Sequence, residues 1–151
     1  MRRQTVRVAL LALMMAATTI VARADQSVAT MLDPYFRIQE ALVADRTDTL
    51  KADAESMVKA AGEMGADGVS IKAAAAELQA TANLADARLA FGKLSAAVIE
   101  YSEHTRLNPG GDVVTMYCPM VKKSWLQKGE TVKNPYFGKA MPGCGEKKKA
   151  V

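Results

Sequence analysis

Residues 33–105 are rich in alanine, and their apolar positions recur in steps of three and four, the spacing of one helix face. Asp33 followed by Pro34 is typical of a helix start, so a first helix is predicted there. A second helix is expected to begin near Thr47 and to stop at Gly65. Its apolar stripe is Leu50, Ala54, Met57, Ala61 and Met64.

After a predicted loop at residues 65–68, two apolar stripes follow. The first is Ile71, Ala75, Leu78, Ala82, Ala85, Leu89, Ala96 and Ile99; the second is Leu84, Ala87, Phe91, Leu94, Val98 and Tyr101. Asn83 and Asp86 favour a break between two helices, although the pattern also allows one long helix. The predicted fold class is therefore all-α, an antiparallel bundle of about four helices in which alanine allows close approach. The helical methionines Met31, Met57 and Met64 are expected to pack in its core.

Residues 108–151 have a different composition, because prolines and glycines punctuate them into turns. A short strand is predicted from Val113 to Cys118. Such an irregular, β-containing segment cannot bury much surface alone, so we expect it to dock on the bundle. The expected docking residues are Tyr117, Trp125, Leu126, Tyr136 and Phe137.

Residues 1–24 have the features of a secretory signal peptide. Three arginines precede an apolar run over residues 8–21, and Ala22 and Ala24 form an A-x-A cleavage site. The run is too short to span a bilayer comfortably, so no membrane insertion is expected after cleavage. The predicted organisation is a signal peptide at 1–24, a helical bundle at 25–107 and a C-terminal segment at 108–151.

The charge balance gives no support to nucleic-acid binding. Four of the 20 Lys and Arg lie in the signal peptide, which leaves 16 basic residues against 16 acidic ones. A nearly neutral mature chain has no electrostatic attraction for nucleic acid or for an anionic membrane. Together with the predicted signal peptide, this indicates an exported protein that is free in solution.

The C-terminal segment carries a set of soft sulfur donors. Met116, Cys118 and Met120 alternate, and Met141 and Cys144 follow some twenty residues later. Alternation on a strand would place the first three on one face, unless Pro119 ends the strand early. Thioether and thiolate sulfurs prefer copper(I) or silver(I) to hard cations. The chain's single histidine, His104, precedes this segment and is a candidate nitrogen ligand.

A disulfide is the alternative for the two cysteines. Exported proteins meet an oxidising compartment, where paired cysteines form bridges. Closing the 25 residues between Cys118 and Cys144 would stabilise the fold by about 3 kcal/mol in the chain-entropy model. A bridge would remove the thiolates but leave the thioethers available, so both interpretations stay open.

The sequence argues against an enzyme. It contains no C-x-x-C redox pair, no haem attachment motif, no glycine-rich phosphate loop and no second histidine for a zinc hydrolase. Pairing Cys118 with His104 as a nucleophile rests on the residue types alone.

Four C-terminal motifs carry a family resemblance. They are Tyr117-Cys118-Pro119-Met120, Trp125-Leu126-Gln127, Asn134-Pro135-Tyr136-Phe137-Gly138, and Met141 with Cys144-Gly145. Together they resemble the signature of a bacterial exported domain of unknown function that is also found joined to periplasmic adaptor subunits of heavy-metal efflux systems. In the last helix, Arg88, Phe91, Leu94 and Ser95 are similar to the family's pattern.

This resemblance implies a periplasmic location and a connection with copper or silver efflux. It makes Cys118, Met120, Met141 and Cys144 the family's sulfur residues, whereas Met116 and His104 are added from local chemistry. The resulting hypothesis is a metal-binding accessory protein for copper(I) or silver(I), with a periplasmic efflux adaptor or another envelope protein as partner. The competing hypothesis is a non-metal interaction module that a Cys118–Cys144 disulfide stabilises and that docks on an envelope or efflux partner.

Overall fold

The computed structural model describes residues 30–105 and 111–148 of the chain. The predicted signal peptide, its cleavage site and the start of the C-terminal segment at residues 108–110 lie outside these ranges. Within the described part, no helix is both long enough and apolar enough to cross a membrane.

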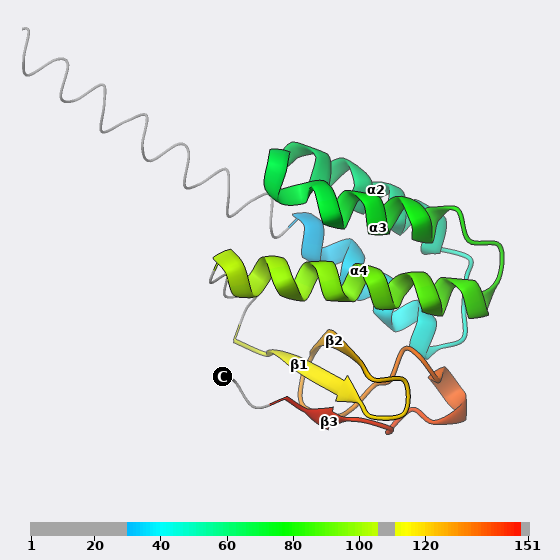
Figure 1. Cartoon of the computed structure of the whole chain (residues 1–151). Coiled ribbons are helices and arrows are strands. Elements are labelled where there is room, and N and C mark those ends of the chain that lie inside the picture. Colours follow the sequence, from blue (N-terminus) through cyan, green and yellow to red (C-terminus); the bar gives the residue numbers. More distant parts are fainter. Residues whose placement is uncertain (1–29, 106–110, 149–151) are drawn as a thin grey trace, which may run out of the picture.

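Four helices make up most of the described chain, as predicted. The first covers residues 30–43, and the others are α2 (Leu50–Glu63), α3 (Val69–Gln79) and α4 (Leu84–Thr105). Successive helices run in alternating directions, and α4 lies between the α2–α3 pair and the C-terminal segment (Figure 1). A short 3₁₀ turn, Gly65–Gly68, joins α2 to α3 where the loop was expected.

The break between α3 and α4 is confirmed. The main-chain N–H of Asp86 donates to Asn83 Oδ1 at 2.9 Å, which satisfies one of the free N–H groups at the start of α4. At the end of α3, Thr81 Oγ1 donates to the carbonyl oxygen of Leu78 at 2.7 Å. Local side-chain hydrogen bonds therefore end one helix and begin the next.

One expectation about the core was wrong. The first stripe was predicted to continue from Leu78 into the last helix, but Ala82 and Ala85 are exposed and Leu89 is 62% exposed. The second stripe is the buried one, with Ala87, Phe91, Leu94 and Val98 fully inside. The irregular residues 80–83 reset the helical phase, so a stripe cannot be carried across them.

The C-terminal segment forms a small antiparallel sheet, which corrects the all-α class to a mostly helical fold with a sheet. Its strands are β1 (Val113–Cys118), β2 (Lys123–Lys128) and β3 (Glu146–Lys147), in the order β2-β1-β3. The first strand has the predicted bounds. The second was missed because Trp125, Leu126 and Gln127 are all buried. Consecutive strand residues point to opposite faces, so both faces of β2 are covered and its sequence does not alternate.

Aromatic side chains join the sheet to the bundle, as predicted. Trp125, Leu126 and Tyr136 are buried, while Tyr117 and Phe137 are partly buried. The ring of Phe91 on α4 lies 5.9 Å from that of Tyr136, which lies 5.8 Å from Trp125. Such ring pairs add to the free energy gained by burying their surface. The helices and the sheet therefore share one hydrophobic core.

Candidate functional site

The structure brings the two cysteines together. Cys118 ends β1, Cys144 lies two residues before β3, and their sulfur atoms are 3.7 Å apart. Cys118 is buried, whereas Cys144 is partly exposed. Both are free thiols in this structure, because a disulfide needs a sulfur separation of about 2.05 Å. We call these two residues the sulfur pair.

The turn that carries Cys144 is closely packed on the sheet. The main-chain N–H of Cys144 donates to the carbonyl oxygen of Met141 at 3.2 Å. Gly145 follows with a φ of 150°, and a Cβ atom there would lie 2.8 Å from the Trp125 ring. Only glycine fits this position, so the backbone beside Cys144 can lie directly against the indole.

The surroundings of the sulfur pair make its two thiols unequal. Burial raises the pKa of Cys118, but hydrogen-bond donors outweigh this effect and leave that pKa below its ordinary value. The donors are the main-chain N–H groups of Val121 and Met120, the Asn134 carboxamide and the Cys144 thiol. Burial, followed by the neighbouring Cys118 sulfur, raises the pKa of Cys144. Cys118 is therefore the sulfur that ionises first, with the Cys144 thiol as a donor to it.

The candidate thioethers occupy three different environments. Met116 is fully buried on the same strand face as Cys118, and its register partner on β2 is Trp125. Met120 lies beyond the strand, in the turn that begins at Pro119, and is 62% exposed. Met141 is partly exposed and lies in the turn before Cys144. The predicted alternation thus holds for Met116 and Cys118, while Pro119 ends the strand before Met120.

His104 is exposed in the last turn of α4 and lies far from the sulfur pair. The register partner of Cys118 is Lys123, and a Cβ atom on Gly92 would lie 2.7 Å from the Lys123 side chain. Twelve residues of helix separate Gly92 from His104, a rise of about 18 Å. His104 is therefore not brought to the two thiols.

Within the described residues, no three His, Cys, Asp or Glu side chains are grouped as a metal site. Any donors beyond the sulfur pair would therefore be thioethers or external ligands. Met120 and Met141 are the thioethers on the turns next to the two cysteines.

Sequence reasoning missed Asn134 as a residue of this site. The Asn134-Pro135 dipeptide indicated only a turn, yet the Asn134 side chain is fully buried and contacts both cysteines. The signal was a polar residue between two hydrophobic stretches, which is too common to reveal a buried amide.

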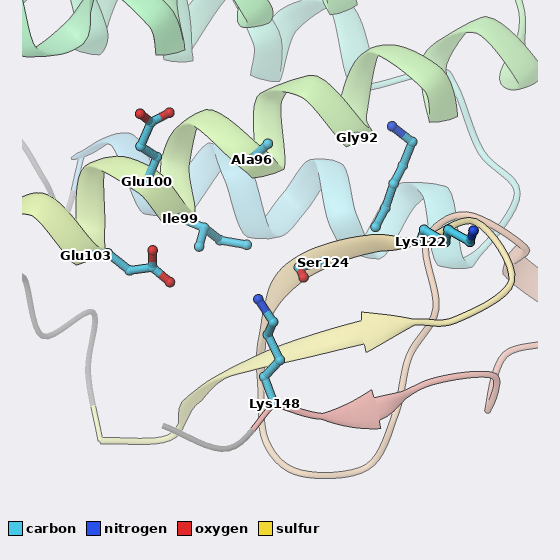
Figure 2. A pocket seen from close by; sticks show the side chains of 9 residues that line it. Gly92, Ala96, Ile99, Glu100, Glu103, Lys122, Ser124 and Lys148 are labelled. Atoms are coloured by element: carbon cyan, nitrogen blue, oxygen red, sulfur yellow. The ribbon is translucent and has the colours of Figure 1, made fainter. Parts of the chain in front are cut away.

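A second feature is a cavity of about 360 Å³ between α4 and the sheet. Glu100 and Glu103 line it from α4, Lys122 lines it from the turn before β2, and Lys148 lines it from just after β3 (Figure 2). None of the sulfur residues lines this cavity. It is therefore separate from the sulfur pair.

Comparison with known proteins gives one match. The family model described as "Protein of unknown function (DUF3347)" matches residues 31–110, which span the four helices. The four C-terminal motifs that carried the resemblance lie beyond the matched range. No curated protein and no solved structure matches the chain.

Proposed function

We propose that this chain, which belongs to the DUF3347 family, is an exported accessory protein that binds copper(I) or silver(I) in the periplasm. The observation that carries the proposal is the 3.7 Å separation of the Cys118 and Cys144 sulfurs. Metal–thiolate bonds are about 2.3 Å long for an ion such as zinc, so two of them reach across this distance. Both thiols can therefore contact one ion with little rearrangement.

The chemistry of the donors favours a soft ion. Thiolates and thioethers bind copper(I) in preference to magnesium or calcium, which need oxygen ligands. The hydrogen-bond donors that lower the pKa of Cys118 reduce the cost of forming its thiolate. Met120 and Met141 are the proposed thioether ligands, whereas the core position of Met116 and the remote position of His104 argue against their use.

The connection with an efflux adaptor or another envelope protein also belongs to this proposal. It comes from the resemblance of the C-terminal motifs. An exposed thioether at Met120 suits transfer to such a partner, because an incoming sulfur ligand can reach an ion there before the buried thiol releases it.

A second candidate is a disulfide-stabilised interaction module without metal. The same 3.7 Å distance supports it, because the two sulfurs need to approach by less than 2 Å to form a bridge. In that case the cysteines would fix the turn at residues 141–145 to β1, and their role would be structural.

Metal competition combined with a thiol count distinguishes the two candidates. The purified protein is reduced under anaerobic conditions and titrated against a chromophoric copper(I) chelator. We expect two free thiols and transfer of one copper(I) per chain, with no comparable uptake of zinc. The variant in which both cysteines are serine should take up none.

A wild-type protein that is fully reduced yet removes no copper(I) or silver(I) from a weak chelator would refute the metal proposal. A quantitative bridge in protein isolated from the periplasm would then favour the interaction module.

A further inference from the structure

Asn134 holds the turn that carries Cys144 by two hydrogen bonds. Its main-chain N–H donates to the carbonyl oxygen of Pro142 at 2.8 Å, and its side-chain Nδ2 donates to the carbonyl oxygen of Cys144 at 2.5 Å. The side chain is fully buried, so these bonds do not compete with water. The backbone on both sides of Gly143 is thus attached to one residue.

The other side of the Asn134 carboxamide is anchored to the core. Its Oδ1 accepts hydrogen bonds from the main-chain N–H of Tyr136 at 2.8 Å and of Phe137 at 3.2 Å. Tyr136 is fixed in turn, because its hydroxyl donates to the carbonyl oxygen of Ser124 at 2.7 Å and its ring packs on Phe91 and Trp125. Asn134 therefore connects a rigid aromatic anchor to the turn at residues 141–145.

We propose that Asn134 is the positioning residue of the sulfur pair. Through its amide nitrogen it holds Cys144 opposite Cys118, whose backbone the pairing of β1 with β2 positions. This inference deepens the proposed function, because two-point binding of any ion depends on the spacing of the sulfurs. It also applies to a bridged pair, so it can succeed or fail separately from metal binding.

The carboxamide is the only side chain of this size that can do both tasks. It provides an acceptor for two N–H groups and a donor for the Cys144 carbonyl. An aspartate would keep the acceptor but lose the donor, and would place a negative charge beside the carbonyl and the Cys118 sulfur. Asn134→Asp therefore keeps the hydrogen bonds to the N–H groups of Tyr136 and Phe137 and the main-chain bond to Pro142, and removes only the side-chain bond to the Cys144 carbonyl.

Gln127 provides a matched control. It is also a fully buried carboxamide, and its Oε1 accepts from Trp125 Nε1 at 3.1 Å and from the main-chain N–H of Lys133 at 3.0 Å. Its Nε2 donates to the carbonyl oxygens of Gly129 and Thr131, at 2.8 and 2.7 Å. Gln127→Glu makes the same chemical change as Asn134→Asp, but on β2, where the side chain holds residues 129–133 and not Cys144.

The test uses phenylarsine oxide, which reports whether two thiols can meet at one atom. Each molecule forms two As–S bonds with the two thiols and releases one water, so no electrons are exchanged. The purified, reduced protein is titrated with this reagent in competition with a small dithiol, and thermal unfolding of each variant is measured in parallel.

We expect Asn134→Asp to weaken arsenical binding at least tenfold and Gln127→Glu to change it less than threefold. Asn134→Ser, which can still cap the Tyr136 and Phe137 N–H groups but cannot reach Cys144, should resemble Asn134→Asp if the latter does not fold.

Equal weakening in the Asn134 and Gln127 variants, in proportion to their loss of stability, would overturn the inference and make Asn134 a general structural residue. Failure of the wild-type protein to bind the arsenical would also overturn it, because the pair would then not be held within reach. If the arsenical result stands but copper(I) and silver(I) do not bind, the metal proposal alone is lost.

Discussion

Arg88 on α4 and Asp45 in the loop after the first helix form an ion pair, with 2.5 Å between Nη2 and Oδ1. Arg88 Nε also donates to the carbonyl oxygen of Pro135 at 3.1 Å, so one guanidinium joins two helical segments to the C-terminal segment. Gly138 lies directly on this pair. A Cβ atom there would be 1.9 Å from Asp45 Oδ1 and 2.2 Å from Arg88 Nη2.

Gly138→Ala is therefore expected to destabilise the protein by about 2 kcal/mol or more, because its φ of 53° is strained for alanine and the methyl group meets the ion pair. Urea unfolding of wild type and variant measures the difference. Gly111→Ala is the control, since a Cβ atom at Gly111 has no atom within 4 Å. Equal urea midpoints for Gly138→Ala and wild type would contradict this prediction. They would show that Arg88 and Asp45 can move away from the methyl group without a loss of stability.

Tyr35 is expected to contribute to docking of the sheet through its hydroxyl. That group lies 2.6 Å from Ser95 Oγ and accepts a hydrogen bond from the main-chain N–H of Leu126 at 2.9 Å. Tyr35→Phe leaves a buried N–H without its partner, which costs about 1–3 kcal/mol. A double-mutant cycle with Ser95→Ala should give a coupling energy of at least about 0.5 kcal/mol. Additive effects of the two substitutions would contradict a shared network.

The stability of the protein is expected to fall steeply with alkaline pH. Burial raises the pKa of Tyr35 and of Tyr136 well above the ordinary value, so both stay neutral in the folded state. In the unfolded chain both tyrosines ionise near pH 10, so above this pH the native state binds more protons than the unfolded state does. The free energy of unfolding should therefore be unaffected by them below pH 10. Above it, each tyrosine lowers this free energy by up to about 1.4 kcal/mol per pH unit.

Urea midpoints between pH 8 and pH 11 check this prediction, with Tyr136→Phe as the comparison. The variant has one fewer buried hydroxyl to ionise on unfolding, so its stability should decline less steeply above pH 10. Parallel curves for variant and wild type would mean that Tyr136 ionises equally in both states.

Replacing Met120 and Met141 together by leucine tests the thioethers. Leucine keeps the apolar volume and removes the sulfur, so the free energy of unfolding should change by less than about 1.5 kcal/mol. If both sulfurs are ligands, copper(I) affinity should fall at least tenfold in the chelator competition. Met64→Leu, at a partly buried position just after α2, is the control and should bind as wild type does. An unchanged affinity in the double variant would restrict the site to the two thiols.

Export is tested by the mass of the secreted product. A charged start, a short apolar run and an A-x-A site predict cleavage after Ala24, so the periplasmic protein should begin at Asp25. Mass spectrometry of protein from the soluble periplasmic fraction measures this directly. A full-length product that stays with the membranes after carbonate washing would contradict the prediction.

Local pattern determined most of the elements of this fold. Helical periodicity and turn residues were enough to predict four helices and the break near Asn83, because hydrogen bonds between near neighbours decide such features. Composition also predicted the strand from Val113 to Cys118, but not its partners β2 and β3. The pattern alone did not predict which face of α4 is buried. Two stripes competed for it, and only packing against the first helix and the sheet placed Phe91 inside and Leu89 outside.

The candidate site was likewise predictable from the sequence only in part. Residue chemistry singled out the sulfurs of Cys118 and Cys144 from the sequence, but their 3.7 Å separation depends on a turn that returns residues 141–145 to the end of β1. Asn134 became visible only in three dimensions, because the hydrogen bond that holds Cys144 joins its side chain to a backbone carbonyl 10 residues away in the sequence. Backbone acceptors look alike in every sequence. Only the tertiary structure decides which side chain meets them.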